Sequence, residues 1–110
     1  MQFAKTFPKI IREIRAVNPD VKIYADNIYN PAKGIDAFSQ VYSVADAYIN
    51  RMNRGFYPSD EYVLVDIKKC FDGEKESMVN LSFKGREIDP HPSEKGHKKI
   101  AQLVIKAMER

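Results

Sequence analysis

The chain has 110 residues, which is enough for one small domain and not for two. Hydrophobic residues make up 44% and charged residues 30%, as in ordinary soluble globular proteins, and no apolar run approaches the roughly 20 residues of a membrane span. The net charge of +3 is spread over expected helix surfaces, without a block of Lys and Arg interleaved with aromatic residues, so we expect no nucleic-acid partner.

A helix over 7–17 and a strand over 21–27 are the first expected elements. Thr6 is a suitable N-cap, and Pro8 suits a first helical turn, where its missing N–H costs nothing. Apolar side chains then recur at helical spacing, at Phe7, Ile10, Ile11, Ile14 and Val17. The turn signal Asn18-Pro19-Asp20 ends the helix, and the β-branched and aromatic run that follows indicates a buried strand.

A second helix and a second strand are expected in the middle of the chain. Asp36 can cap a helix that ends at about Arg54, with Gly55 at the C′ position after it. The side chains expected on its buried face are Phe38, Val41, Tyr42, Ala45, Tyr48, Ile49 and Met52. Residues 62–67 (YVLVDI) form a near-continuous apolar run, which is typical of a strand covered on both faces.

The last third of the chain is expected to end in a long helix. A short helical piece over 68–71 is followed by an irregular stretch over 72–89. The terminal helix begins at Ser93 and runs to about Glu109. Its expected apolar stripe is Ile100, Ala101, Val104, Ile105 and Met108.

Helices that alternate with strands predict a mixed α/β fold, with parallel strands joined by right-handed crossovers. Only two strands are visible, and a two-stranded parallel sheet of such apolar strands leaves faces uncovered. We therefore expect residues 1–110 to form a single domain, whose sheet is completed by another chain or by a further part of a larger domain.

Asp89 and His91 stand in the loop just before the terminal helix. A neutral imidazole can act as a general base, and a carboxylate two residues away can orient its ring or stabilise its charged form. Pro90 and Pro92 stiffen this loop. The same pair before a helix is also a common capping or turn arrangement, so these residues alone leave both interpretations open.

The run 89–97 (DPHPSEKGH), followed by Lys-Lys-Ile-Ala, resembles the last sequence block of the SGNH, or GDSL-type, hydrolases. In that family the block has Asp, then His and Pro, then Asn or Ser, and then Gly before an apolar helix. Residues 10–29 are similar to the family's helix, Asn-Pro turn and strand, 48–53 to its helix with a recurrent Asn, and 63–66 to the next strand. The resemblance covers almost the whole chain, and the last block is its specific part.

This resemblance implies a partial three-layer α/β/α fold of the flavodoxin-like kind, and a role for each matching residue. His91 would be the general base that activates a serine nucleophile and then protonates the leaving alcohol. Asp89 would be its acidic partner. The family more often places two residues between the acid and the histidine, but Ile88 stands at that position, so Glu87 is a weaker candidate for the acid.

The family's nucleophile block Gly-Asp-Ser and its oxyanion block Gly-x-Asn-Asp do not occur in this sequence. The six serines, which stand in other contexts, are Ser39, Ser43, Ser59, Ser77, Ser82 and Ser93. The chain thus resembles the C-terminal half of a serine esterase, inactive alone and completed by an N-terminal half or by further copies of itself. A completed enzyme would act on a carboxylic ester without a cofactor. The alternative is a non-catalytic, self-associating interaction module with the same fold.

Other candidate residues are weaker. Asp89, His91 and His97 could together hold a metal, but His97 lies on the expected helix where the family has a packing residue, so no metal site is expected. Asp26 and Asn27 end the first strand, where α/β proteins place ligands, and are as readily turn formers.

Cys70 is the single cysteine, so no intrachain disulfide is expected. Its apolar neighbours Ile67 and Phe71 indicate a packed thiol rather than a catalytic one. Residues 1–5 lack a charged region followed by an apolar core, so no signal peptide is predicted. If the chain is complete as given, we expect it in the cytoplasm.

Overall fold

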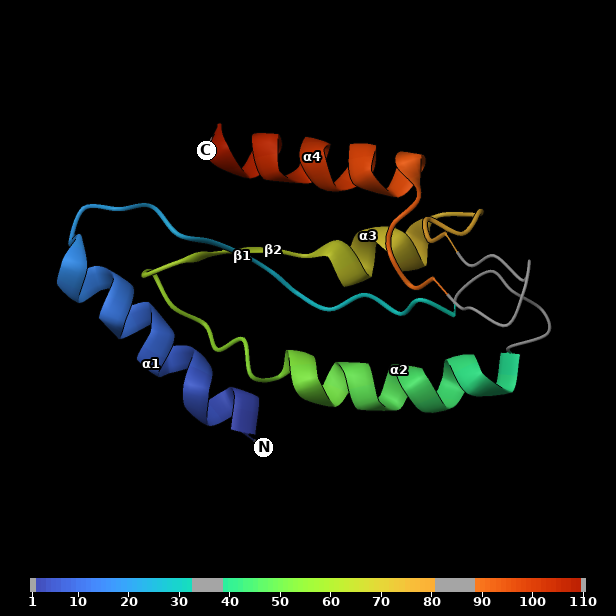
Figure 1. Cartoon of the computed structure of the whole chain (residues 1–110), viewed down its shortest axis with the longest axis horizontal. Coiled ribbons are helices and arrows are strands. Elements are labelled where there is room, and N and C mark those ends of the chain that lie inside the picture. Colours follow the sequence, from blue (N-terminus) through green and yellow to red (C-terminus); the bar gives the residue numbers. More distant parts are fainter. Residues whose placement is uncertain (1, 33–38, 81–88, 110) are drawn as a thin grey trace.

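Figure 1 shows the computed structural model, which describes residues 2–32, 39–80 and 89–109. Its elements, in chain order, are α1 (Gln2–Val17), β1 (Tyr24–Asp26), α2 (Ser39–Asn53), β2 (Val63–Val65), α3 (Ile67–Gly73) and α4 (Glu94–Met108). β1 and β2 pair in parallel, with Tyr24 opposite Val63 and Asp26 opposite Val65. The predicted mixed α/β fold with two parallel strands is confirmed.

Two apolar clusters pack against the strands. Helix α4 lies on one side of the strands, and α1 and α2 lie on the other (Figure 1). The α4-side cluster contains Val65, Ile67, Phe71 and Met78, together with Ile100, Leu103, Val104 and Ala107 of α4. The α1-side cluster contains Phe7, Ile11 and Tyr62, with Phe3 and Phe56 packed against them. The fold therefore depends on two small cores.

Helix α1 begins at Gln2, more than one turn earlier than predicted, so Thr6 is not its N-cap and Pro8 lies inside it. The physical reason is aromatic packing. The centroid of the Phe3 ring lies 5.4 Å from that of Phe7 and 5.0 Å from that of Phe56. Burial of Phe3 stabilises the additional turn and offsets the two costs of Pro8, which are the lost backbone hydrogen bond and the clash of its ring with the preceding turn.

Gly55 serves the same α1-side cluster and does not have the left-handed conformation that a C′ glycine would have. A Cβ atom at this position would lie 2.5 Å from Cδ1 of Phe3, well inside contact distance. The position is therefore suited to glycine because the Phe3 ring approaches the backbone closely.

Both strands are shorter than predicted. Nη1 of Arg15 donates to the carbonyl oxygen of Val21 at 2.5 Å, which holds the chain before β1 in a turn. The prediction that β2 is covered on both faces is wrong, because Val63 and Leu64 are 38% and 41% exposed while Val65 is buried. The described residues thus leave part of an apolar strand facing solvent.

The buried faces of the helices are narrower than their apolar stripes predict. The side chains that were predicted inside and are exposed are Ile10, Ile14, Val17, Val41, Tyr48, Ala101, Ile105 and Met108. In α4, Leu103 and Ala107 pack against the core, whereas Ala101, Ile105 and Met108 do not. The reason is that α1 and α4 each pack on one small cluster, and among the described residues of α2 only Ile49 is buried. Asp36 and Phe38, expected at the start of α2, lie outside the described residues.

Helix α4 begins as predicted, with Ser93 as its N-cap. Oγ of Ser93 accepts a hydrogen bond from the Gly96 N–H at 3.1 Å, and the Ser93 N–H donates to the Met78 carbonyl at 2.9 Å. A Cβ atom on Gly96 would lie only 2.1 Å from that same carbonyl oxygen. The helix can therefore approach Met78 this closely only with glycine at position 96.

We expect Gly96→Ala to lower the free energy of unfolding by about 2 kcal/mol, because the added methyl group must displace backbone atoms. Urea unfolding followed by circular dichroism measures this change. Gly73→Ala is the matched control, since a Cβ atom there meets nothing within 4 Å. It should be neutral or stabilising by up to about 1 kcal/mol. Equal effects of the two substitutions would contradict the close packing at Gly96.

Candidate functional site

The loop over 89–93 is held by backbone hydrogen bonds to the segment 78–80. Besides the bond from Ser93 to Met78, the N–H of Asn80 donates to the carbonyl oxygen of His91 at 2.8 Å. One isolated antiparallel bridge joins the two segments. The loop leads directly into α4 (Figure 1), and the bond from Ser93 to Met78 attaches it to the α4-side core.

Asp89 and His91, predicted as an acid–base pair, lie in contact. Nδ1 of His91 lies 2.6 Å from Oδ1 of Asp89, and the backbone N–H of His91 donates to the same oxygen at 3.0 Å. The backbone N–H and then the ring of His91 lower the pKa of Asp89, so its carboxylate is ionised at neutral pH and only accepts hydrogen bonds. A neutral His91 therefore carries its proton on Nδ1 and leaves Nε2 as the basic atom.

Both side chains of the pair are open to solvent. The His91 side chain is 81% exposed and that of Asp89 is 45% exposed. The pair can take a proton from a hydroxyl group or a water and stabilise the imidazolium that forms. Glu87, the weaker candidate for the acid, lies outside the described residues.

Tyr29 reaches this loop from the segment after β1. Its hydroxyl group donates to the Pro90 carbonyl at 2.7 Å, and the centroid of its ring lies 5.0 Å from that of Phe71. Burial, and then the charge of Asp89, raise the pKa of Tyr29. Because Tyr29 follows the carboxyl end of β1, the acid–base pair lies at the end of the sheet where parallel α/β proteins bind ligands.

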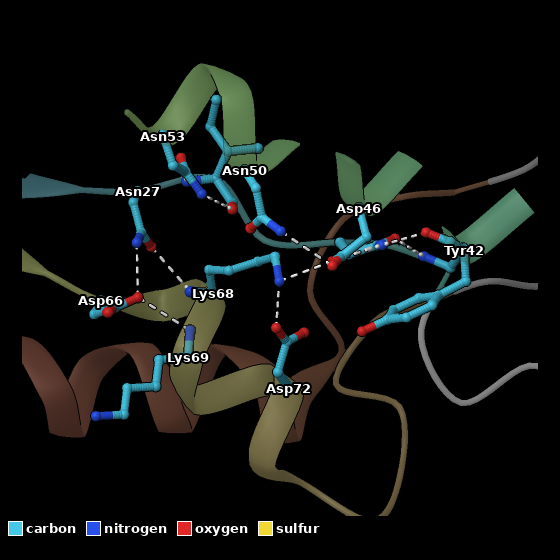
Figure 2. Close-up of polar contacts among 12 residues, drawn as sticks. Asn27, Tyr42, Asp46, Asn50, Asn53, Asp66, Lys68, Lys69 and Asp72 are labelled. Atoms are coloured by element: carbon cyan, nitrogen blue, oxygen red, sulfur yellow. Dashed lines mark hydrogen bonds and ion pairs between the residues drawn. The ribbon is translucent and has the colours of Figure 1, made fainter. Parts of the chain in front are cut away.

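The residues at the end of β1 join the strand to α3. Nδ2 of Asn27 donates to Oδ1 of Asp66 at 2.7 Å, and Oδ1 of Asn27 accepts from the Lys68 N–H at 2.9 Å (Figure 2). Asp66 also caps α3 by accepting from the Lys69 N–H at 3.0 Å. Both polar ends of Asn27 are used in these bonds, which favours the turn-forming alternative. Burial raises the pKa of its neighbour Asp26.

A buried ion-pair cluster between α2 and α3 was missed by the sequence analysis. Lys68 is only 8% exposed, and its Nζ lies 2.8 Å from Oδ1 of Asp46 and in contact with Asp72 (Figure 2). The buried Asn30 donates to Oδ1 of Asp46 at 3.3 Å, and Asn50 donates to Oδ2 of Asp46 at 3.2 Å. The i, i+4 spacing of Lys68 and Asp72 could have indicated their ion pair from the sequence. No pattern in the sequence indicates that Lys68 also pairs with Asp46.

Burial and pairing act in opposite directions on this cluster. Burial lowers the pKa of Lys68, but the carboxylates of Asp46 and Asp72 raise it more, so it lies above its ordinary value. Burial raises the pKa of Asp46, but Lys68 and Asn30 lower it more. Lys68 therefore stays protonated and does not offer a nucleophilic amine, and the cluster joins α2 to α3.

The other sequence candidates do not add to the acid–base pair. Within 2–32, 39–80 and 89–109, no three His, Cys, Asp or Glu side chains are grouped so as to hold a metal ion, and His97 is exposed on α4. Burial, and then Glu74, raise the pKa of Cys70, so its thiol is not activated. A groove of about 660 Å³ runs along β2, α3 and α4, and none of its lining residues belongs to the loop over 89–93.

No helix in the described part of the chain combines the length and the apolar character that a membrane crossing requires.

No protein-family model, no curated protein and no solved structure matches this chain. Its function is therefore inferred from the geometry of its own residues.

We expect Lys68→Met to lower the free energy of unfolding by about 2 kcal/mol at neutral pH, because it leaves two partly buried carboxylates unpaired. The effect is smaller than for a fully buried pair, because the Asp46 and Asp72 side chains are 25% and 30% exposed. The matched control is Lys98→Met, which removes an exposed i, i+4 pair with Glu94 and should cost at most about 0.5 kcal/mol.

This destabilisation should depend on pH at both ends of the range. The lowered pKa of Asp46 gives stability that is present above about pH 4 and is lost as the pH falls through the folded-state pKa. The raised pKa of Lys68 gives stability that is present below about pH 10 and is lost as the pH rises through the folded-state pKa. Urea unfolding of the chain and both variants across this range checks the expectation. A difference that does not change with pH would show that the cluster is not an ion pair.

Proposed function

We propose that this chain supplies the acid–base half of a serine ester hydrolase of the SGNH type, within a partial flavodoxin-like three-layer α/β/α fold. The observation that carries the proposal is the 2.6 Å contact between Nδ1 of His91 and Oδ1 of Asp89. Two further residues of the block that resembles the family support it. Ser93 caps α4, and Gly96 permits the close approach of the helix to Met78.

The proposed reaction uses His91 first as a base and then as an acid. Its Nε2 accepts the proton of a serine hydroxyl group as the serine oxygen bonds to the ester carbonyl carbon. Asp89 stabilises the imidazolium, which gives its proton to the alcohol oxygen as the ester C–O bond breaks. A water molecule, activated by the same nitrogen, then hydrolyses the acyl-serine. The substrate class is a carboxylic ester.

The serine and the oxyanion donors come from a complementing N-terminal half in this proposal. Among the described serines, Ser93 stands closest in sequence to His91, but its Oγ accepts the capping bond from Gly96. Ser59 and Ser77 accept backbone N–H groups of Glu61 and Val79 at 3.0 and 3.2 Å. These contacts favour local structural roles for the three serines.

We expect the chain alone to show no turnover of a short-chain nitrophenyl ester, because a base without a nucleophile and oxyanion donors has little effect on an ester. Release of nitrophenol, measured against buffer, checks this. Robust hydrolysis that disappears in His91→Ala would show that a serine of this chain is the nucleophile, and the proposed need for a second half would be wrong.

The decisive test supplies the second half. The N-terminal half of an SGNH esterase, with its Gly-Asp-Ser and Gly-x-Asn blocks, is joined ahead of the full chain. Ester hydrolysis should appear, and His91→Ala should reduce kcat by at least about 10³-fold. His97→Ala is the matched control and should leave kcat unchanged. If a fluorophosphonate labels the serine of a folded hybrid and hydrolysis is the same with His91→Ala, the acid–base role is excluded.

The alternative function, a self-associating module without catalysis, is favoured by the exposed apolar side chains. Val63 and Leu64 on β2 and Val41 and Val44 on α2 are exposed, and apolar surface of this kind marks interaction sites. It is compatible with the first proposal, because copies of the chain can cover these surfaces until a complementing half binds.

We expect light scattering over a concentration series to show association of the full chain, because burial of exposed apolar side chains favours it. Leu64→Asp should shift the distribution toward the monomer. Ala101→Asp, at an exposed position of α4, is the matched control and should leave it unchanged. A monomeric mass at every concentration would count against self-association.

A further inference from the structure

The peptide unit between Pro90 and His91 is hydrogen-bonded on both sides. Its carbonyl oxygen accepts from the Tyr29 hydroxyl group at 2.7 Å, and its N–H donates to Oδ1 of Asp89 at 3.0 Å. The same Oδ1 contacts Nδ1 of His91 at 2.6 Å. A continuous series of hydrogen bonds thus runs from the phenol through the peptide unit to the carboxylate, and each donor in such a series polarises the next. The carboxylate oxygen at its end is the atom that contacts the imidazole.

Tyr29 is well placed to fix one end of this series. Its ring packs on Phe71, which is buried in the α4-side core, and it lies three residues after Asp26, the last residue of β1. The loop also forms backbone hydrogen bonds with Met78 and Asn80. Tyr29 therefore fixes the position of the exposed acid–base pair relative to the end of the sheet. The segment 78–80 fixes its position relative to α4.

The Tyr29 hydroxyl group remains a donor throughout the pH range in which an imidazole titrates. Burial, and then the charge of Asp89, raise its pKa above the ordinary value of 10.0. A histidine changes its charge several units lower, between about pH 5 and 8. The phenol therefore keeps its proton whichever form His91 adopts.

We propose that Tyr29 is a positioning residue for the acid–base pair, acting through the Pro90–His91 peptide unit. Because the Pro90 carbonyl accepts a hydrogen bond from Tyr29, the His91 N–H becomes a stronger donor to Asp89. This stronger bond holds Oδ1 of Asp89 in contact with Nδ1 of His91. A contribution of Tyr29 to catalysis rests on the proposed function of the pair as general base and acid. Its physical basis is a set of contacts within the chain and can be tested without hydrolysis.

The test uses the full chain and Tyr29→Phe, which removes the hydroxyl group and keeps the ring on Phe71. Carbon-13 NMR of the Asp89 carboxyl group measures its titration. The midpoint should rise from its lowered value toward the roughly 3.9 of an unconstrained aspartate, because the His91 N–H becomes a weaker donor. The side chain of Asn80 also lowers the pKa of Asp89, and the substitution leaves that contact in place.

The matched control is Tyr48→Phe, which removes the hydroxyl group of a tyrosine that is 63% exposed on α2. It should leave the Asp89 midpoint and the His91 ring resonances as they are in the unmodified chain. Because the readout is a titration midpoint, a general loss of stability in Tyr29→Phe does not imitate the expected result while the protein remains folded.

A second substitution tests the same coupling from the other end. Burial, and then the charge of Asp89, raise the pKa of Tyr29. Asp89→Asn removes the second of these causes, so the titration midpoint of this phenol, followed by carbon-13 NMR of its Cζ atom, should fall. An unchanged Asp89 midpoint in folded Tyr29→Phe, or an unchanged Tyr29 midpoint in Asp89→Asn, would overturn the inference. Neither result decides whether the chain belongs to an esterase, which the hybrid enzyme decides separately.

Discussion

The carbonyl group of Met78 joins both the loop over 89–93 and the first turn of α4 to the rest of the fold. It accepts the hydrogen bond of the Ser93 N–H, and the first turn of α4 packs on it at Gly96, with no side chain between them. The Met78 side chain is buried in the α4-side core. Because one residue gives its side chain to the core and its carbonyl group to the loop, a displacement of either moves the other. The geometry of Asp89 and His91 thus depends on packing as well as on their local turn.

The second constraint is the small size of the sheet. A compact domain of 110 residues has a radius of gyration of about 13 Å, whereas that of this chain is 15.7 Å. In the described part of the chain, two strands of three residues each give the helices little surface to pack on, so each helix buries only part of its apolar stripe. This mismatch between apolar surface and core supports the proposal that further polypeptide completes the sheet.

The features that could be predicted from the sequence are those decided by neighbours along the chain. The cap at Ser93 and the contact within the acid–base pair each arise within four residues, and the order of helices and strands follows from periodicity. The features that could not be predicted depend on distant partners. Packing of Phe3 moved the start of α1, Asp46 of α2 paired with Lys68 of α3, and Tyr29 reached the loop from 61 positions away. No local pattern encodes such contacts, because they form only when the strands bring their flanking segments together.

The bond from Tyr29 to Pro90 has a consequence for how the chain would meet a complementing half. It joins segments on either side of β2, α2 and α3, so it exists only after this chain has folded. The acid–base pair is then preorganised before any partner arrives. Association would not have to order this loop, so its conformational entropy would already be lost, and more of the interaction free energy would appear as affinity. A nucleophile delivered by the partner would meet a base that is already oriented.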